Sequence, residues 1–347
     1  MKHLTASFSI VAALLGASFT SPGDDAPTLR VFLLVGQSNM EGKGAIEHLD
    51  ALLADEATAP TYAHLKQGEE WRVRDDVWIS YQHGENDDRK GGLSVGYGSR
   101  PNQIGPELGF GSVIGDALEE DVLLIKCAWG GASLKADFLP PSAGGPGAHY
   151  TRMLSETRAV LDDLGGRFPA LAEHEVELAG LVWFQGWNDA VGGGNPDYTE
   201  QLAAFVRDVR AELDAPALPV VIGELGQAGD QDVNANTQAF RDQQAAVAAL
   251  PEFEGSVAFV RTAPFIDPVL HEQFQIWRRC SGAARRAETD EAKEAAWADW
   301  RAVEAAYAAR TSDRPYHYFG SGEVFYAMGD AFGRGMLPLL GLEAQSR

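Results

Sequence analysis

The segment around Ser38 has the residue types of a nucleophile site. An apolar run at 29–35 stops abruptly at Gly36-Gln37-Ser38-Asn39. This pattern predicts a buried strand that delivers Ser38 to a tight turn before a helix, at the sheet edge where α/β proteins bind ligands. A serine hydroxyl there acts as a nucleophile only beside a base. The alternative interpretation is that Ser38 merely caps the following helix, as serine often does.

His317 is the candidate base. It precedes a helix expected from residue 323 to about 337, and a loop histidine at that place can reach across a sheet edge toward Ser38. Two other loop histidines, His83 and His149, compete for the role. The sequence therefore leaves the base open among three residues, with His317 preferred.

Two further residues are candidate donors to an oxyanion. Gly105 directly precedes Pro106-Glu107, which is typical of a helix start, so its N–H is expected to be free. Asn188 follows the apolar run 178–184, where a side-chain amide can donate to the same oxygen. The alternatives are an ordinary helix start for Gly105 and a turn residue for Asn188.

Alternating apolar runs and amphipathic stretches must position these residues. We expect strands at 31–35, 122–125, 178–184, 220–222 and 257–260, and helices at 109–118, 151–164, 198–213 and 236–250. This alternation predicts an α/β fold, a flavodoxin-like three-layer sandwich around a central five-stranded parallel sheet. Two insertions are expected, a long excursion at about 41–104 and a helical insertion at about 270–311, within a single domain spanning 24–347.

Composition excludes some classes of partner. The 347 residues carry a net charge of -22, which disfavours nucleic-acid binding. Residues 1–23 resemble a secretory signal peptide, and no later stretch is apolar enough to span a membrane, so we expect a secreted or periplasmic protein. No residue spacing suggests a metal site. Cys127 closes a predicted strand and is expected to be a buried thiol, whereas its pairing with Cys280 stays open.

The order of these motifs resembles the SGNH hydrolase superfamily, and within it the sialate O-acetylesterase-like carbohydrate esterases. The matching blocks, which are spread over about residues 29–338, are Gly36-Gln37-Ser38-Asn39-Met40, Gly105-Pro106-Glu107, Trp183-Phe184-Gln185-Gly186, Gly186-Trp187-Asn188-Asp189 and His317. The segment 126–134 also looks like a family loop at a strand end. The resemblance implies the SGNH hydrolase fold and a Ser–His catalytic pair.

The chain departs from the family in front of His317. The superfamily usually has an aspartate three residues before the histidine, but here that position is Arg314, and Asp313 stands one residue earlier. Pro315 restrains the intervening backbone, so the loop is not the usual one. The third member of the triad is therefore open between Asp313, Glu224 and a backbone carbonyl, with Asp313 preferred.

The resemblance implies removal of O-acetyl groups from a carbohydrate without metal or organic cofactor. Ser38 attacks the acetyl carbonyl, His317 transfers the proton, and the Ser38 N–H, the Gly105 N–H and the Asn188 amide stabilise the oxyanion. The candidate substrate contacts are Gln37, Gln185 and Trp187. The rival functions are an esterase or lipase for other acyl esters and a non-catalytic carbohydrate-binding protein of the same fold. The sequence indicates neither the glycan nor the oligomeric state.

Overall fold

The computed structural model describes residues 26–343 except 192–193, 228, 232 and 314. The predicted signal peptide therefore lies outside the described residues. Within the part of the chain that is described, no helix is both long enough and apolar enough to cross a membrane.

A seven-stranded sheet forms the middle layer, in the order β11-β10-β9-β1-β8-β5-β6. Its strands are β1 (Thr28–Gly36), β5 (Val77–Gly84), β6 (Asp87–Gly92), β8 (Asp121–Ala128), β9 (Glu175–Phe184), β10 (Val220–Gly223) and β11 (Val257–Val260). All neighbours pair in parallel except β5 and β6, which are antiparallel. Strand β1 is central and covered on both faces, which explains its unbroken apolar run.

The five predicted strands are present and adjacent to one another. Taken in chain order, they follow the flavodoxin-like order 2-1-3-4-5. The strand number was wrong, because segment 41–104 adds the β5–β6 hairpin beside β8. The strands of this hairpin carry polar residues such as Gln82, Asp88 and Arg89, so their sequence lacks the apolar run by which the other strands were recognised.

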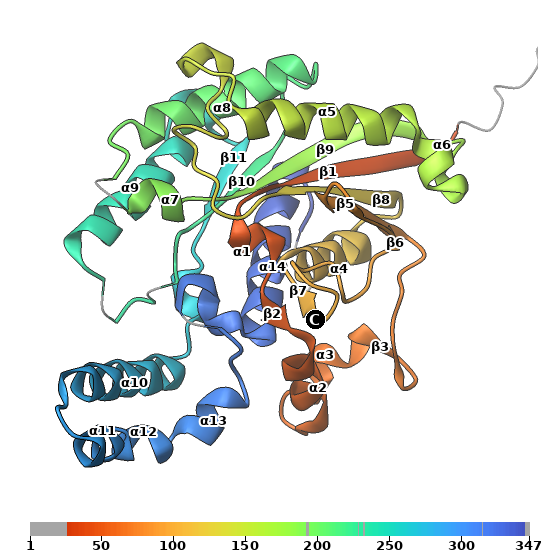
Figure 1. Ribbon diagram of the computed structural model, residues 1–347. Coiled ribbons are helices and arrows are strands. Elements are labelled where there is room, and N and C mark those ends of the chain that lie inside the picture. The colour runs from red at the N-terminus through yellow and green to blue at the C-terminus, as the bar shows by residue number, and fades with distance from the viewer. Residues whose placement is uncertain (1–25, 192–193, 228, 232, 314, 344–347) are drawn as a thin grey trace, which may run out of the picture.

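Helices cover both faces of the sheet (Figure 1). On one face lie α5 (Ala148–Asp162), α8 (Tyr198–Glu212) and α9 (Ala235–Ala248), whose buried side chains share one apolar cluster with alternate residues of β1 such as Val31 and Leu33. On the other face lie α4 (Glu107–Ala117) and α14 (Gly322–Met336), which pack on Phe32 and Leu34. The helices α4 and α14 touch backbone to backbone, since a Cβ at Gly329 would lie 2.0 Å from the carbonyl oxygen of Pro106.

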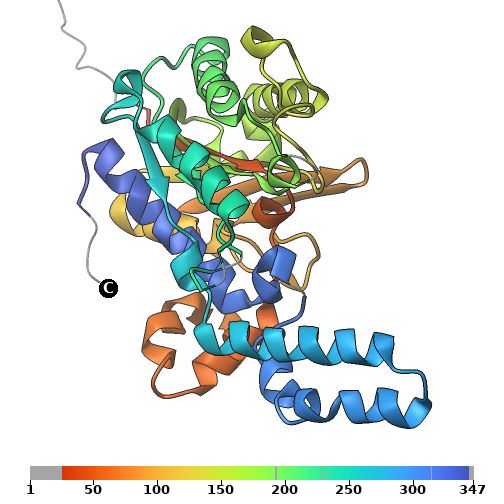
Figure 2. The ribbon, with the colours of Figure 1, turned by 90° about the vertical axis from the view of Figure 1, so that its left-hand side faces the viewer.

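The short elements of the chain occupy the loops around this sandwich. They are α1 (Ser38–Glu41), β2 (Gly44–Ala45), α2 (Ile46–Ala54), α3 (Ala59–Tyr62), β3 (Lys66–Gln67), β4 (Glu70–Trp71), β7 (Gln103–Ile104), α6 (Leu164–Arg167) and α7 (Trp187–Ala190). Helices α10 (Pro268–Arg286), α11 (Asp290–Ala296), α12 (Ala298–Arg301) and α13 (Glu304–Ala308) fold back on each other as a projecting arm (Figure 2). The predicted helical insertion at 270–311 thus corresponds to helices α10–α13.

Candidate active site

The segments with predicted catalytic residues meet at the carboxyl edge of the sheet. Strands β1 and β9 are neighbours at the point where the strand order reverses, the usual ligand position in this type of fold. Ser38 follows β1, and Asn188 follows β9. A Cβ at Gly36 would lie only 2.2 Å from the carbonyl oxygen of Phe184, so glycine is required for the two strand ends to come this close.

Ser38 is the first residue of the short helix α1. Gln37 is the residue that precedes the helix, and its side chain makes no capping hydrogen bond. The structure therefore does not support the alternative in which Ser38 only caps the helix. Ser38 is partly exposed, whereas its neighbours Gln37 and Asn39 are buried. Its hydroxyl is thus presented to the sheet edge by a buried, well-packed turn.

His317 reaches this turn from the far end of the chain. Its Nδ1 atom lies 3.2 Å from Oδ1 of Asn39, the residue directly after Ser38. No hydrogen bond joins the Ser38 and His317 side chains among the contacts of the described residues. Burial lowers the pKa of the His317 imidazole, and the charge of Lys43 lowers it further, while Asp313 opposes both. A ring that stays neutral is suited to accept a proton.

The backbone after His317 is strained and held by buried contacts. Tyr318 and Phe319 both have positive φ, at 50° and 61°, which is costly for large side chains. Hydrogen bonds of the Tyr318 hydroxyl offset this cost, because it accepts from Gly226 N–H at 2.8 Å and pairs with Thr262 Oγ1 at 2.7 Å. These contacts fix the position of His317 at the strand ends, in a segment that the sequence alone predicted only as a loop.

Asp313 approaches the imidazole from the side opposite to Asn39. Its Oδ2 atom lies 3.7 Å from Nε2 of His317, an ion-pair distance rather than a hydrogen bond. In a Ser–His–Asp triad Nδ1 faces the aspartate, whereas here Nε2 faces Asp313 and Nδ1 faces Asn39.

Glu224 has a different task. Its Oε2 atom accepts hydrogen bonds from the backbone N–H groups of Thr262 and Ala263, each at 2.9 Å. The Glu224 carbonyl oxygen accepts a bond from the Tyr318 hydroxyl at 3.2 Å. This buried carboxylate therefore joins β10 to the loop after β11. Glu224 stabilises the loop that carries His317 and does not make the imidazole contact that the sequence left open.

Gly105 does not present a free N–H. Its amide donates to Oε1 of Glu107 at 2.7 Å, so the expectation of an unpaired helix-start donor was wrong. The other oxygen of Glu107 accepts from Nζ of Lys126 at 2.6 Å, and both of these side chains are fully buried. Sequence reasoning missed this ion pair, because a lysine within an apolar strand gives no sign of its partner.

Asn188 lies in α7 at the same sheet edge. Its side-chain Nδ2 donates to the carbonyl oxygen of Gly131, in the loop after β8. A carboxamide nitrogen carries two hydrogens, so a second donor remains for a ligand. Asp189, in contrast, is fully buried and accepts from the backbone N–H of Leu134 at 2.7 Å, which ties α7 to the same loop.

The three predicted substrate contacts divide into two groups. Gln37 and Gln185 are each only 2% exposed, and Nε2 of Gln185 donates to Oε1 of Gln37 at 3.1 Å. They brace the strand ends and, in this structure, offer no surface to a ligand. Trp187 is partly exposed, and its ring packs edge-on against that of Tyr316 at 5.2 Å.

A buried carboxylate that the sequence did not indicate lies beside the turn. Glu41, in the same short helix as Ser38, accepts from Gly130 N at 2.6 Å and from Lys43 Nζ at 2.9 Å, and Nε2 of His83 lies 3.5 Å away. Burial alone would raise the pKa of Glu41, but these partners hold it below its usual value. His83 thus belongs to the Glu41 cluster, and His149 packs on Trp129 at 4.8 Å.

A profile of one protein family matches this arrangement of motifs. The family is described as "Carbohydrate esterase, sialic acid-specific acetylesterase", and the match covers residues 28–260. The chain belongs to this family of carbohydrate esterases. It is therefore a carboxylic ester hydrolase. The matched region includes Ser38, Gly105 and Asn188, whereas His317 lies beyond it.

Individual relatives of the esterase are distant. It is 26% identical over 234 residues to the probable carbohydrate esterase At4g34215 of Arabidopsis thaliana, covering 62% of this chain and 78% of that protein. The crystal structure of At4g34215 aligns with a TM-score of 0.45 and 16% identity, over 81% of this chain and 99% of that one. XAC1771, a carbohydrate acetylesterase from Xanthomonas citri, aligns with a TM-score of 0.47 and 18% identity, over 69% of this chain and 51% of that one.

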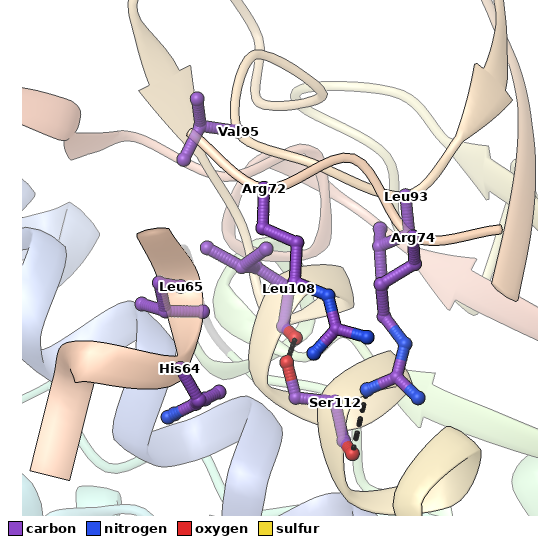
Figure 3. A pocket seen from close by; sticks show the side chains of 8 residues that line it. All are labelled: His64, Leu65, Arg72, Arg74, Leu93, Val95, Leu108 and Ser112. Atoms are coloured by element: carbon purple, nitrogen blue, oxygen red, sulfur yellow. Dashed lines mark hydrogen bonds between the residues drawn. The ribbon is translucent and has the colours of Figure 1, made fainter. Parts of the chain in front are cut away.

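One small cavity of the esterase lies outside the site. It has a volume of about 20 Å³ and is lined by residues that include His64, Arg72, Arg74 and Ser112 (Figure 3). Arg74 is engaged by Asp76 and Asp116, so its charge is already neutralised. The cavity has room for about one water molecule.

Cys127 and Cys280 are both buried free thiols. Within the described residues, no group of three or more His, Cys, Asp or Glu side chains is placed to hold a metal.

Proposed function

We propose that the protein is a serine esterase that removes O-acetyl groups from a carbohydrate, with Ser38 as nucleophile and His317 as general base. The observation that carries this proposal is the contact of His317 with Asn39, beside a serine presented at the reversal point of the sheet. Membership of the carbohydrate esterase family supports the acyl chemistry and the class of substrate.

The proposed reaction has two balanced halves. In the first, Ser38 Oγ attacks the acetyl carbonyl while a ring nitrogen of His317 takes the hydroxyl proton, and that proton then passes to the sugar oxygen that leaves. In the second, His317 takes a proton from water, the hydroxide attacks the acetyl-serine, and acetate departs as Ser38 regains its proton.

The proposal assigns two hydrogen-bond donors to the oxyanion. The N–H of Ser38 belongs to the first turn of α1, where backbone donors lack partners within the helix. The second hydrogen of the Asn188 amide is the other donor. Gly105 contributes only if its N–H leaves Glu107, so we assign it primarily to holding the loop.

Acetate release tests this proposal. The purified protein is assayed with acetylated neutral oligosaccharides, O-acetylated sialic acid and a long-chain acyl ester, beside its Ser38→Ala variant. We expect acetate from at least one carbohydrate and a loss of about 10³-fold or more in Ser38→Ala with an unchanged melting temperature. Near-normal turnover by the variant would contradict the assignment of the nucleophile, and preference for the long-chain ester would contradict the substrate class.

We also propose that residues 1–23 are a signal peptide and that 24–347 form a single domain exported to the periplasm or the medium. The short positive start, apolar stretch and small polar exit support this proposal. Expression of the full chain in a secreting bacterial host tests it. N-terminal sequencing of the exported protein is expected to begin between residues 17 and 24, and retention of an intact protein in the cytosol would contradict it.

A further inference from the structure

A second concave surface lies next to the proposed active site. It is a cleft of about 750 Å³ between α7 and α9, the two helices that follow β9 and β10 and lie side by side in Figure 1. Trp187 and Phe240 contribute aromatic rings to it, and Asn195, Asn236 and Gln243 contribute amides. None of the side chains found to line it is ionisable. Its lining is thus aromatic and amide-rich without charge.

The cleft is connected to the nucleophile through one aromatic pair. Trp187 belongs to the cleft, and its ring contacts Tyr316 at 5.2 Å. Tyr316 is exposed and precedes His317, which touches Asn39 beside Ser38. A ligand long enough to pass over the Tyr316–Trp187 pair therefore reaches the cleft and the serine at once.

One buried polar atom points to a missing ligand. Gln227, which lines the cleft, is only 5% exposed, and its Oε1 atom has no hydrogen-bond partner among the described residues. A buried carbonyl oxygen without a donor costs free energy, so such groups are rare in folded proteins. The Oε1 atom is closed to solvent in this structure, so a hydroxyl group bound in the cleft supplies the missing donor once the Gln227 side chain turns toward it.

We propose that this cleft is a subsite for an uncharged sugar residue, a neighbour of the acetylated residue at Ser38 in the same glycan chain. The assignment of the second sugar to this cleft rests on the proposed function at Ser38. It narrows that function from carbohydrates in general to glycans with neutral units.

The chemistry of the lining selects this class of ligand. Sugar hydroxyls both donate and accept, and a carboxamide offers two donors and one acceptor oxygen to match them. The C–H faces of a sugar ring pack on aromatic side chains, and Trp187 is the partly exposed aromatic residue of the cleft. A carboxylated sugar would require a cation, and no cation is among the side chains found to line the cleft.

Direct binding of unacetylated oligosaccharides tests the proposal independently of catalysis. Titration calorimetry on the full protein uses xylo-, manno- and cello-oligosaccharides of four to six units, and sialyllactose as the anionic probe. We expect at least one neutral oligosaccharide to bind more tightly than sialyllactose. Gln227→Leu should raise its Kd about threefold to tenfold, the effect of one lost hydrogen bond, and Trp187→Ala should raise it further.

Gln238→Leu is the matched control, because Gln238 is on α9 but exposed outside the cleft, with its amide on Asp242 at 2.8 Å. We expect the Kd to stay unchanged in this variant. We also expect Gln227→Leu to keep or raise the melting temperature, since it removes an unpaired buried oxygen, so weaker binding cannot be attributed to unfolding. Equal effects of the two leucine variants would overturn the subsite.

The outcomes separate this proposal from the esterase proposal. If no neutral oligosaccharide binds, or if sialyllactose binds most tightly, the subsite is wrong even where acetate is released. If neutral oligosaccharides bind and Gln227→Leu weakens them, but no acetylated carbohydrate is hydrolysed, the subsite stands and the proposed function fails. With acetylated oligosaccharides, the cleft variants should raise KM more than they lower kcat.

Discussion

Nδ1 of His317 lies 3.2 Å from Oδ1 of Asn39, a contact that joins two residues 278 positions apart in the chain. Because a carboxamide oxygen only accepts, this contact places the ring proton on Nδ1 and leaves Nε2 as the basic nitrogen. Asn39 is buried at 2% exposure, so the turn that presents Ser38 also orients the histidine.

Replacement of Asn39 tests this orienting role. Asn39→Leu should lower kcat about tenfold to a hundredfold with little change in KM, because it removes the acceptor but no substrate contact. Asn39→Asp keeps an acceptor and adds a negative charge, so it should retain more activity and move the acid limb of the pH profile upward. Steady-state kinetics across pH would show the two effects, and identical profiles for both variants would refute the role.

Asp313 and Glu224 should separate kinetically. Asp313→Asn removes the charge near His317 and is expected to lower kcat by about 10² to 10⁴ with stability nearly kept. Glu224→Gln disturbs a buried carboxylate with two backbone donors, so it should lower stability first. The measurements are kcat and the urea midpoint of each variant. Parental turnover in Asp313→Asn would show that Asn39 orients the imidazole alone.

Asn188→Ala should slow turnover by about 10² to 10³ if its amide donates to the oxyanion. The loss is expected in kcat rather than KM, because that donor acts mainly in the transition state. The hydrogen bond to Gly131 is also lost, so the melting temperature is measured in parallel. A rate equal to that of the parent would reduce Asn188 to a turn residue.

The pH profile should reflect the lowered pKa of His317. Burial disfavours the charged ring, so activity, which needs the neutral base, persists below the usual histidine value of about 6.5 and is lost as pH falls through the folded pKa. The contribution of neutral His317 to folding stability is present above its unfolded pKa and is lost as pH falls through its folded pKa. Lys43→Met should raise the midpoint of kcat/KM, and Asp313→Asn should lower it. Shifts of the opposite sign would exclude His317 as the titrating base.

The buried pair Lys126–Glu107 should dominate stability near the site. Lys126→Met leaves a buried carboxylate uncompensated and is expected to cost about 3 to 5 kcal/mol in urea unfolding. Adding Glu107→Gln removes that charge while keeping an acceptor for Gly105, so the double variant should be more stable than Lys126→Met alone. If the double variant is less stable than Lys126→Met alone, the uncompensated Glu107 carboxylate is not the cause of the lost stability.

Local sequence patterns predicted most strands and helices of the fold. The apolar run before Gly36 predicted the central strand and the turn at Ser38, because a strand covered on both faces needs unbroken apolar residues. The alternation of such runs with amphipathic stretches predicted the parallel sheet and its helices. The β5–β6 hairpin was missed, because the edge strand β6 is short and charged and the apolar residues of β5 are interrupted by Ser80 and Gln82.

Only the tertiary structure decided which polar groups meet. From the sequence we preferred Asp313 and left Glu224 open as an alternative, but Glu224 is engaged by Thr262 and Ala263 after a neighbouring strand. The sequence predicted a free N–H at Gly105, but this N–H donates to Glu107. It gave Asn39 no role, although Asn39 contacts His317. Hydrogen bonds between distant segments depend on how the strand ends are placed side by side, and no local periodicity encodes that placement.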